Sequence, residues 1–342
     1  MNALRTQMRR EIDEIPDAVE HLLINGSDAV TSTAAHIRDL APGYLLSVAR
    51  GSSDHACTYL KYASELLLGL PMASVGPSVK SIYGVDLMCK GALSLSVSQS
   101  GKSPDIVQLT SAFTAGGAYT VAITNDAMSP LAEASEAILP IHAGPELSVA
   151  ATKTFVTSLV AGLWLMAEVK QDAELLSAIR RLPVHLAKAK ECNWSAAIEA
   201  VGGQSLYTLG RGPSWAISNE AALKFKETCQ IHAESYSAAE VLHGPVSIVG
   251  REFPVIAFAA GDAAEASVAE IAEALAAKGA RVFATTEQAK GVEVLPHVRT
   301  DHWITDPIAS IVSFYGMVET VAVRRGVNPD APRHLNKVTE TI

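Results

Sequence analysis

The chain has 342 residues, enough for two domains with cores of ordinary size, and 49% of them are hydrophobic, which favours buried elements over disorder. Its formal net charge of −9 provides no basic surface of the kind that binds nucleic acid, so we expect no nucleic-acid partner. The polar N-terminus has no signal-peptide core, and the longest apolar run, 155–169, is shorter than the roughly 20 residues that span a bilayer. We predict a cytoplasmic protein with no membrane partner, in which this run forms a buried helix.

The predicted elements begin with an N-terminal helical leader over residues 1–30. Strands and helices then alternate twice. Apolar runs that end in or begin at glycine recur in the two halves, and Gly51 matches Gly212, Gly101 matches Gly261 and Gly117 matches Gly279 at nearly constant separation. This regularity indicates an internal duplication, and the alternation predicts an α/β protein with a doubly wound, mainly parallel sheet in each half.

The duplication places one domain over residues 31–172 and a second over residues 196–325. Between them, the charged and helix-prone stretch 173–195 is predicted to be a helical linker broken at Pro183. The tail, 326–342, has two prolines and weak apolar periodicity. We expect it to be extended and to close over the site.

A hydroxyl-rich turn follows the second predicted strand of the first domain. Residues 98–103 read Ser-Gln-Ser-Gly-Lys-Ser, directly before Pro104. If a helix starts at Pro104, hydroxyls, backbone N–H groups and the positive helix end converge, which is typical of a phosphate site. A nucleotide P-loop would need glycine at Ser96, and Gly210-Arg-Gly212 lacks the third glycine of the dinucleotide fingerprint. The turn predicts a phosphorylated small molecule as ligand; a polar turn that binds nothing is the alternative.

The second half offers candidate catalytic side chains instead of hydroxyls, since Ala259 and Ala260 stand in its matching turn. Glu220, Lys224 and Glu227 share one face of a helix predicted to start at the carboxyl end of a strand, where open α/β sheets bind ligands. They form either an acid–base row or a solvated stripe of ion pairs.

Two further side chains are candidates by chemistry. His243 lies in a predicted loop and is either a proton carrier near neutral pH or an ordinary surface histidine. Lys337 lies in the tail and becomes a nucleophilic amine only if the tail desolvates it. The four cysteines are too far apart for a zinc pair, and His232-Ala-Glu234 alone is a weak metal site. We therefore expect no metal and no other cofactor.

Six segments together resemble the paired sugar isomerase (SIS) domains of glucosamine-6-phosphate synthase and of the SIS-type glucosamine-6-phosphate deaminases. The resemblance covers nearly the whole chain and implies two tandem SIS domains that act on a hexosamine or hexose 6-phosphate without a cofactor. The segments are 98–101, 146–153, 220–227, 231–234, 240–245 and 332–337.

The resemblance also implies a role for each matching residue. Glu227 would carry a proton between C1 and C2 of the sugar, with Lys224 as its charged neighbour. Lys337 would condense with the ketose, and His243 would open the sugar ring from a neighbouring subunit, which implies a homodimer. Ala151 stands where the family has a serine that contacts sugar hydroxyls, so the substrate contacts differ there. The implied phosphate- and substrate-binding positions are Ser52, Ser53, Ser98, Gln99, Ser100, Ser103, Val149, Ala151 and Glu220.

The synthases carry an N-terminal glutaminase domain that releases ammonia, whereas this chain begins almost at once with the sugar-binding unit. We therefore expect the hydrolytic direction, in which glucosamine 6-phosphate and water give fructose 6-phosphate and ammonia. The alternatives are a galactosamine-6-phosphate deaminase, a deglycase for phosphorylated sugar–amine adducts, a synthase subunit supplied by a separate glutaminase, and a sensor that binds sugar phosphates without turnover.

Overall fold

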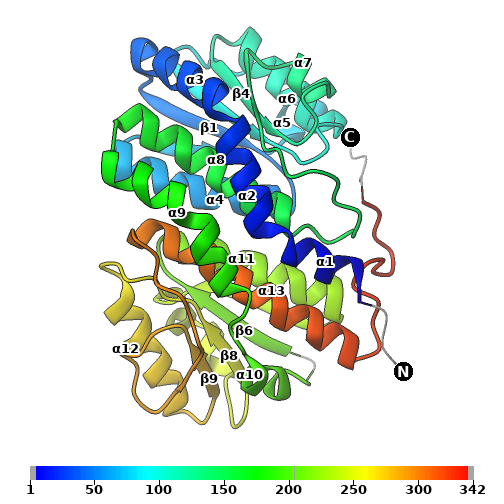
Figure 1. Ribbon diagram of the computed structural model, residues 1–342, viewed down its shortest axis with the longest axis vertical. Helices are drawn as coiled ribbons and strands as arrows, with labels where there is room; N and C mark the ends of the chain where they lie inside the picture. The colour runs from blue at the N-terminus through cyan, green and yellow to red at the C-terminus, as the bar shows by residue number, and fades with distance from the viewer. Residues whose placement is uncertain (1–4, 204, 338–342) are drawn as a thin grey trace. The chain divides into compact units, whose positions relative to one another are not determined.

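The computed structural model describes residues 5–203 and 205–337, which form two compact units. We call them the repeat-1 unit and the repeat-2 unit after the half of the duplication that each contains. The repeat-1 unit is built from 17–146, 153–180 and the last two described residues; the repeat-2 unit is built from the described residues up to 16, from 147–152 and from 181–335. Each unit contains one parallel five-stranded sheet (Figure 1).

The repeat-1 sheet has helices on both faces, which is why all six residues of its central strand β3 are buried. Helices α3, α4 and α8 lie on one face, and α5, α6 and α7 lie on the other (Figure 1). The strands, in the order β2-β1-β3-β4-β5, are β1 (Tyr44–Val48), β2 (Met72–Ser74), β3 (Ala92–Val97), β4 (Tyr119–Thr124) and β5 (Ala137–Pro140). The helices are α3 (Ser27–Leu40), α4 (Ser52–Ala63), η1 (Ser64–Leu68), α5 (Ser78–Ser81), α6 (Pro104–Ala115), α7 (Pro130–Glu133) and α8 (Lys153–Lys170); α2 (Ile15–Asn25) begins just before the unit.

Helix α12 packs on the repeat-2 sheet in one hydrophobic core, and aromatic side chains of α13 and η2 pack together in another. The strands of the repeat-2 sheet, in the order β10-β9-β8-β6-β7, are β6 (Ser205–Gly210), β7 (His232–Ser237), β8 (Pro254–Ala257), β9 (Arg281–Ala284) and β10 (Glu293–Val294). Its helices are α1 (Gln7–Asp13), α10 (Ser195–Ala200), α11 (Pro213–Lys224), η2 (Phe225–Cys229), η3 (Glu240–His243), η4 (Pro245–Ile248), α12 (Glu265–Ala276), η5 (Trp303–Thr305) and α13 (Asp306–Arg324).

The predicted duplication is confirmed element by element. The two strand orders become identical when β1–β5 are matched to β6–β10 in sequence. Gly51 and Gly212 precede α4 and α11 with nearly the same backbone angles, φ of 56° and 58°. Each of these helices then widens into a π-helical turn, η1 or η2, which ends at a left-handed residue, Gly69 or Gln230.

Gly69 gives a direct test of the cost of this left-handed ending. Its φ is 68°, and a Cβ added there would meet no atom within 4 Å, so a substitution should cost backbone strain alone. We expect Gly69→Ala to lower the free energy of unfolding by about 1 kcal/mol and Gly69→Asn to lower it by less, because asparagine tolerates this conformation. Urea unfolding of both variants measures the difference; equal losses would contradict the backbone explanation.

Two expectations about helices have opposite outcomes. The buried helix predicted over 155–169 is confirmed as α8, whose residues 153–167 are all buried. The break predicted at Pro183 is wrong, because α9 (Ala173–Ala189) runs through it without interruption. Burial of Leu182 and Leu186 on either side of the proline offsets its cost of about 3 kcal/mol in a helix interior.

The C-terminal segment has neither helix nor strand from 326 to 337, and residues 338–342 of the predicted tail lie outside the described residues. No helix within residues 5–203 and 205–337 combines the length and the hydropathy needed to cross a lipid bilayer.

Candidate functional site

The hydroxyl-rich turn lies at the point where the order of the repeat-1 sheet reverses. The chain leaves β1 toward β2 on one side, and β3 then pairs with β1 on the other side. Sheets of this order bind ligands beyond the carboxyl ends of the strands at this reversal. Residues 98–103 follow β3 directly, and Ser52 and Ser53 begin α4 just after β1. Both groups of predicted phosphate-binding hydroxyls therefore lie at the same end of adjacent strands.

Internal hydrogen bonds hold the turn in a compact shape. Ser98 is buried, and its Oγ accepts from the Gly101 N–H at 3.1 Å; the Ser100 Oγ accepts from the Lys102 N–H at 3.3 Å. Gly101 has a φ of 62°, and a Cβ at this position would collide with Ser129. Ser103 is the N-cap of α6, and its side chain makes no capping hydrogen bond. Hydroxyls and helix N–H groups thus meet in an arrangement suited to an anion.

The matching turn of the repeat-2 unit is occupied by the chain's own side chains. The Gly261 N–H donates to Asp306 Oδ2 at 2.8 Å. Arg299 donates to the Ala259 carbonyl at 2.8 Å and lies 3.6 Å from the same Asp306 oxygen. An internal carboxylate and its arginine partner therefore fill this turn, in agreement with the absence of hydroxyls that the sequence showed.

Glu220, Lys224 and Glu227 form a buried cluster in the repeat-2 unit. Lys224 Nζ lies 3.0 Å from Glu220 Oε1 and 2.6 Å from Glu227 Oε2, and both Lys224 and Glu220 are fully buried. Tyr315 donates to Glu220 Oε1 at 3.2 Å. Burial acts to lower the Lys224 pKa, but the two carboxylates and their hydrogen bonds raise it above its usual value. The solvated stripe is therefore wrong, since a buried ammonium is held between two carboxylates.

The π-helical turn η2 places Glu227 at the edge of this cluster, where its side chain is 21% exposed. Such turns occur often at functional sites. Glu227 lines a pocket of about 470 Å³ together with residues of the C-terminal segment. The lining residues are Leu223, Lys226, Glu227, Gln230, Ile231, His232, Arg333, His334 and Leu335.

The remaining predicted residues lie in other surroundings. Lys337 Nζ donates to Glu146 Oε2 at 2.8 Å, and the buried Glu146 also accepts from the Thr154 N–H and Oγ1 at 3.1 and 2.6 Å. His243 is exposed at the end of η3 and is not among the residues that line the Glu227 pocket. Val149 and Ala151 are half-buried, and the Val149 N–H donates to the carbonyl of Asp330.

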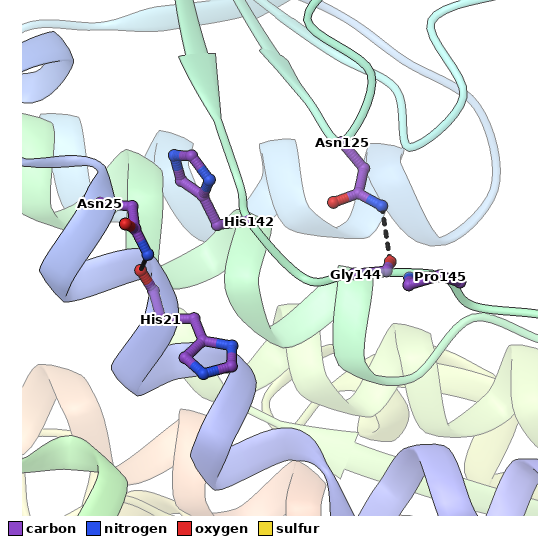
Figure 2. Close-up of a pocket in the computed structure, with 6 residues that line it drawn as sticks. All are labelled: His21, Asn25, Asn125, His142, Gly144 and Pro145. Atoms are coloured by element: carbon purple, nitrogen blue, oxygen red, sulfur yellow. Dashed lines mark hydrogen bonds between the residues drawn. The ribbon is translucent and has the colours of Figure 1, made fainter.

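A second pocket, of about 590 Å³, lies in the repeat-1 unit and contains none of the predicted residues (Figure 2). Asn125 links it to the hydroxyl-rich turn, because its N–H donates to the Gln99 carbonyl at 3.2 Å while its side chain donates to the Gly144 carbonyl at 2.8 Å. Burial lowers the pKa of His142. Asn125 directly follows β4, and a polar residue at the carboxyl end of a strand is the sequence signal that could have identified this pocket. The lining residues are His21, Asn25, Asn125, His142, Gly144 and Pro145.

Within the described residues, no three His, Cys, Asp or Glu side chains gather closely enough to hold a metal ion.

Comparisons with known proteins agree with the duplicated architecture. A crystal structure from Silicibacter pomeroyi, designated a candidate phosphosugar isomerase, is 61% identical, with a TM-score of 0.92 over 95% of this chain and 100% of that one. The glutamine–fructose-6-phosphate aminotransferase (isomerizing) of Sulfolobus acidocaldarius is 32% identical over 96% of this chain, which spans 56% of that enzyme's length. A glucosamine-6-phosphate deaminase from Thermotoga maritima shares the fold at 20% identity, with a TM-score of 0.79 over 97% of this chain and 99% of that one.

The model of the SIS domain matches the chain twice, over residues 44–167 and 203–323. The first match begins at β1 and the second just before β6, so each contains one of the two five-stranded sheets. This chain belongs to the SIS domain family and carries two SIS domains in tandem.

Proposed function

We propose that this SIS protein is a phosphosugar isomerase that deaminates glucosamine 6-phosphate to fructose 6-phosphate and ammonia. The observation that carries the proposal is the Glu227 carboxylate, which lines a pocket and lies 2.6 Å from a buried ammonium ion. The hydrogen bond from that ammonium orients the carboxylate, as a group that removes a proton from carbon needs. The relatives with isomerase and aminotransferase names support the same class of chemistry.

The proposed sequence of steps starts with the phosphate held by Ser53, Ser98, Ser100 and Ser103. His243, donated by the second subunit of a homodimer, opens the sugar ring. Glu227 then removes the C2 proton and returns it to C1, while the C1 carbonyl oxygen gains a proton and the amine loses one. These transfers turn the 2-amino aldose into a 2-imine with a C1 hydroxyl. Water adds to C2 and ammonia leaves, so that one water is consumed for each ammonia released.

The phosphate lies far from the bonds that change, so its binding energy can orient the first two carbons at Glu227 instead of only raising affinity. Water is abundant at a site that solvent reaches, whereas free ammonia is dilute. We therefore propose the hydrolytic direction rather than the synthetic one.

Lys337 has the proposed role of capturing the ketose as an imine. Its amine and the C2 carbonyl would join with loss of one water molecule. An ammonium ion is not a nucleophile, so its proton must first move, and the Glu146 carboxylate at 2.8 Å is placed to accept it.

Ammonia release from glucosamine 6-phosphate by the purified protein tests the proposed function. Faster release from galactosamine 6-phosphate would assign the other C4 epimer, and release from a phosphorylated sugar–amine adduct would assign a deglycase. Binding of these compounds without turnover would support a sensor, and synthesis only with a separate glutaminase would support a synthase subunit. Neither turnover nor binding with any of them would reject the proposal.

Trapping with borohydride tests the role of Lys337. We expect fructose 6-phosphate and borohydride to attach one reduced hexose phosphate to Lys337 of the wild type, located by peptide mass spectrometry. Lys337→Arg should give no adduct, because guanidinium does not form the imine. Lys278→Arg is the control, since Lys278 is exposed just after α12 and is not among the residues that line the Glu227 pocket, so this change should leave trapping unchanged. An adduct on another lysine would contradict the assignment.

A further inference from the structure

An ion pair joins the two turns at the reversal point of the repeat-1 sheet. Arg50 follows β1 and precedes Ser52 and Ser53, while Asp105 is the second residue of α6 and follows Ser103. The Arg50 Nε and Nη2 groups both donate to Asp105 Oδ2, at 3.1 and 2.8 Å. The Asp105 side chain is fully buried, and the Arg50 side chain is 52% exposed.

A buried carboxylate at this place is unfavourable for a phosphate site unless it is paired. Asp105 lies two positions after Ser103, so its charge would oppose a bound dianion. Arg50 neutralises that charge, and its two hydrogen bonds draw the start of α6 toward the turn after β1. The pair therefore fixes the separation of the two groups of hydroxyls.

The repeat-2 unit has the same two side-chain positions without this connection. Arg211 matches Arg50 in the duplication, but it donates to Ser267 Oγ. Glu265 matches Asp105, but its partner is Arg299 at 2.5 Å. Among the described residues, an arginine–carboxylate pair thus joins the two turns of the repeat-1 unit, which has the hydroxyl-rich turn. In the repeat-2 unit, where the Asp306 carboxylate fills the matching turn, the arginine and the acid have other partners.

We infer that Arg50 is a positioning residue for phosphate, acting through Asp105 to hold the turn at Ser52 and Ser53 in register with residues 98–103. This inference rests on the proposed function. Arg50 is not one of the hydroxyl residues proposed to bind phosphate; it acts on the geometry of that set.

Calorimetry with glucosamine 6-phosphate tests this role. We expect Arg50→Gln and Asp105→Asn each to weaken binding about 10-fold, the usual effect of losing one charged hydrogen-bonded pair. In turnover, KM should rise by a similar factor while kcat changes little. Arg211→Gln is the matched control and should bind like the wild type.

Asp105→Asn is the decisive variant because two explanations predict opposite signs. If Asp105 is only a nearby negative charge, its removal should tighten binding of the phosphate; if it anchors Arg50, its removal should weaken binding. Tighter or unchanged binding by Asp105→Asn, or unchanged binding by Arg50→Gln, would overturn the inference. Should Asp105→Asn fail to show the wild-type thermal unfolding transition, the half-exposed Arg50→Gln decides alone.

Failure of the wild type to bind glucosamine 6-phosphate would reject the proposed function instead. The two failures are therefore distinguishable in one series of titrations.

Discussion

Replacement of Glu227 by glutamine is expected to lower kcat for ammonia release by about 10²- to 10⁴-fold, the usual contribution of a general acid–base group. Glutamine keeps the size and one hydrogen-bond acceptor for Lys224, but it cannot take up the C2 proton. Binding of glucosamine 6-phosphate should change little, because the proposed phosphate contacts lie elsewhere. Ammonia release and calorimetric titration of the same preparation measure both quantities.

The control for this variant is Glu270→Gln, which removes an exposed carboxylate from α12 and should leave kcat unchanged. Wild-type turnover by Glu227→Gln would show that another group moves the proton. Loss of binding together with turnover would assign Glu227 to substrate affinity rather than to proton transfer.

Replacement of Lys224 by methionine is expected to lower the free energy of unfolding by about 3–5 kcal/mol, as is found when one partner of a buried ionic group is removed. Methionine fills a similar volume, but it leaves Glu220 fully buried without the ammonium that lies 3.0 Å from it. Chemical unfolding monitored by circular dichroism measures the loss.

Two comparisons separate charge from packing in this experiment. Lys226→Met, at an exposed position two residues away, should change stability by only about 0.5 kcal/mol. Glu220→Gln combined with Lys224→Met should lose less stability than Lys224→Met alone, because a neutral amide replaces one stranded carboxylate. Equal losses for Lys224→Met and Lys226→Met would show that the buried ammonium stabilises nothing.

The central strands of both sheets could be predicted from the sequence, whereas the edge strands could not. Strands β1, β3, β4, β6, β8 and β9 are apolar runs because helices cover both faces of the sheet. β2 and β10 have three and two residues, too few for a periodic signal, and β7 reads His-Ala-Glu-Ser-Tyr-Ser, a polar pattern. The π-helical turns were also missed, because their residues fit an ordinary helix.

The site was predictable where one short segment carries the signal. The turn at 98–103 and the spacing of Glu220, Lys224 and Glu227 are local patterns, and the structure places each as a compact group. The pairs Lys337–Glu146 and Arg50–Asp105 join positions far apart in the chain. No single segment of the sequence indicates such pairs, because they form only where distant segments of the chain meet in the fold.

The discontinuous make-up of the two units limits how this protein can be divided. Glu11 of α1 accepts hydrogen bonds from the backbone N–H groups of Leu147 and Ser148, and the Val149 N–H donates to Asp330. These segments all belong to the repeat-2 unit, although residue 11 precedes the first SIS domain and 147–149 lie within it. A chain cut at residue 173 would separate them from most of that unit, so the two fragments should regain their folds only when refolded together.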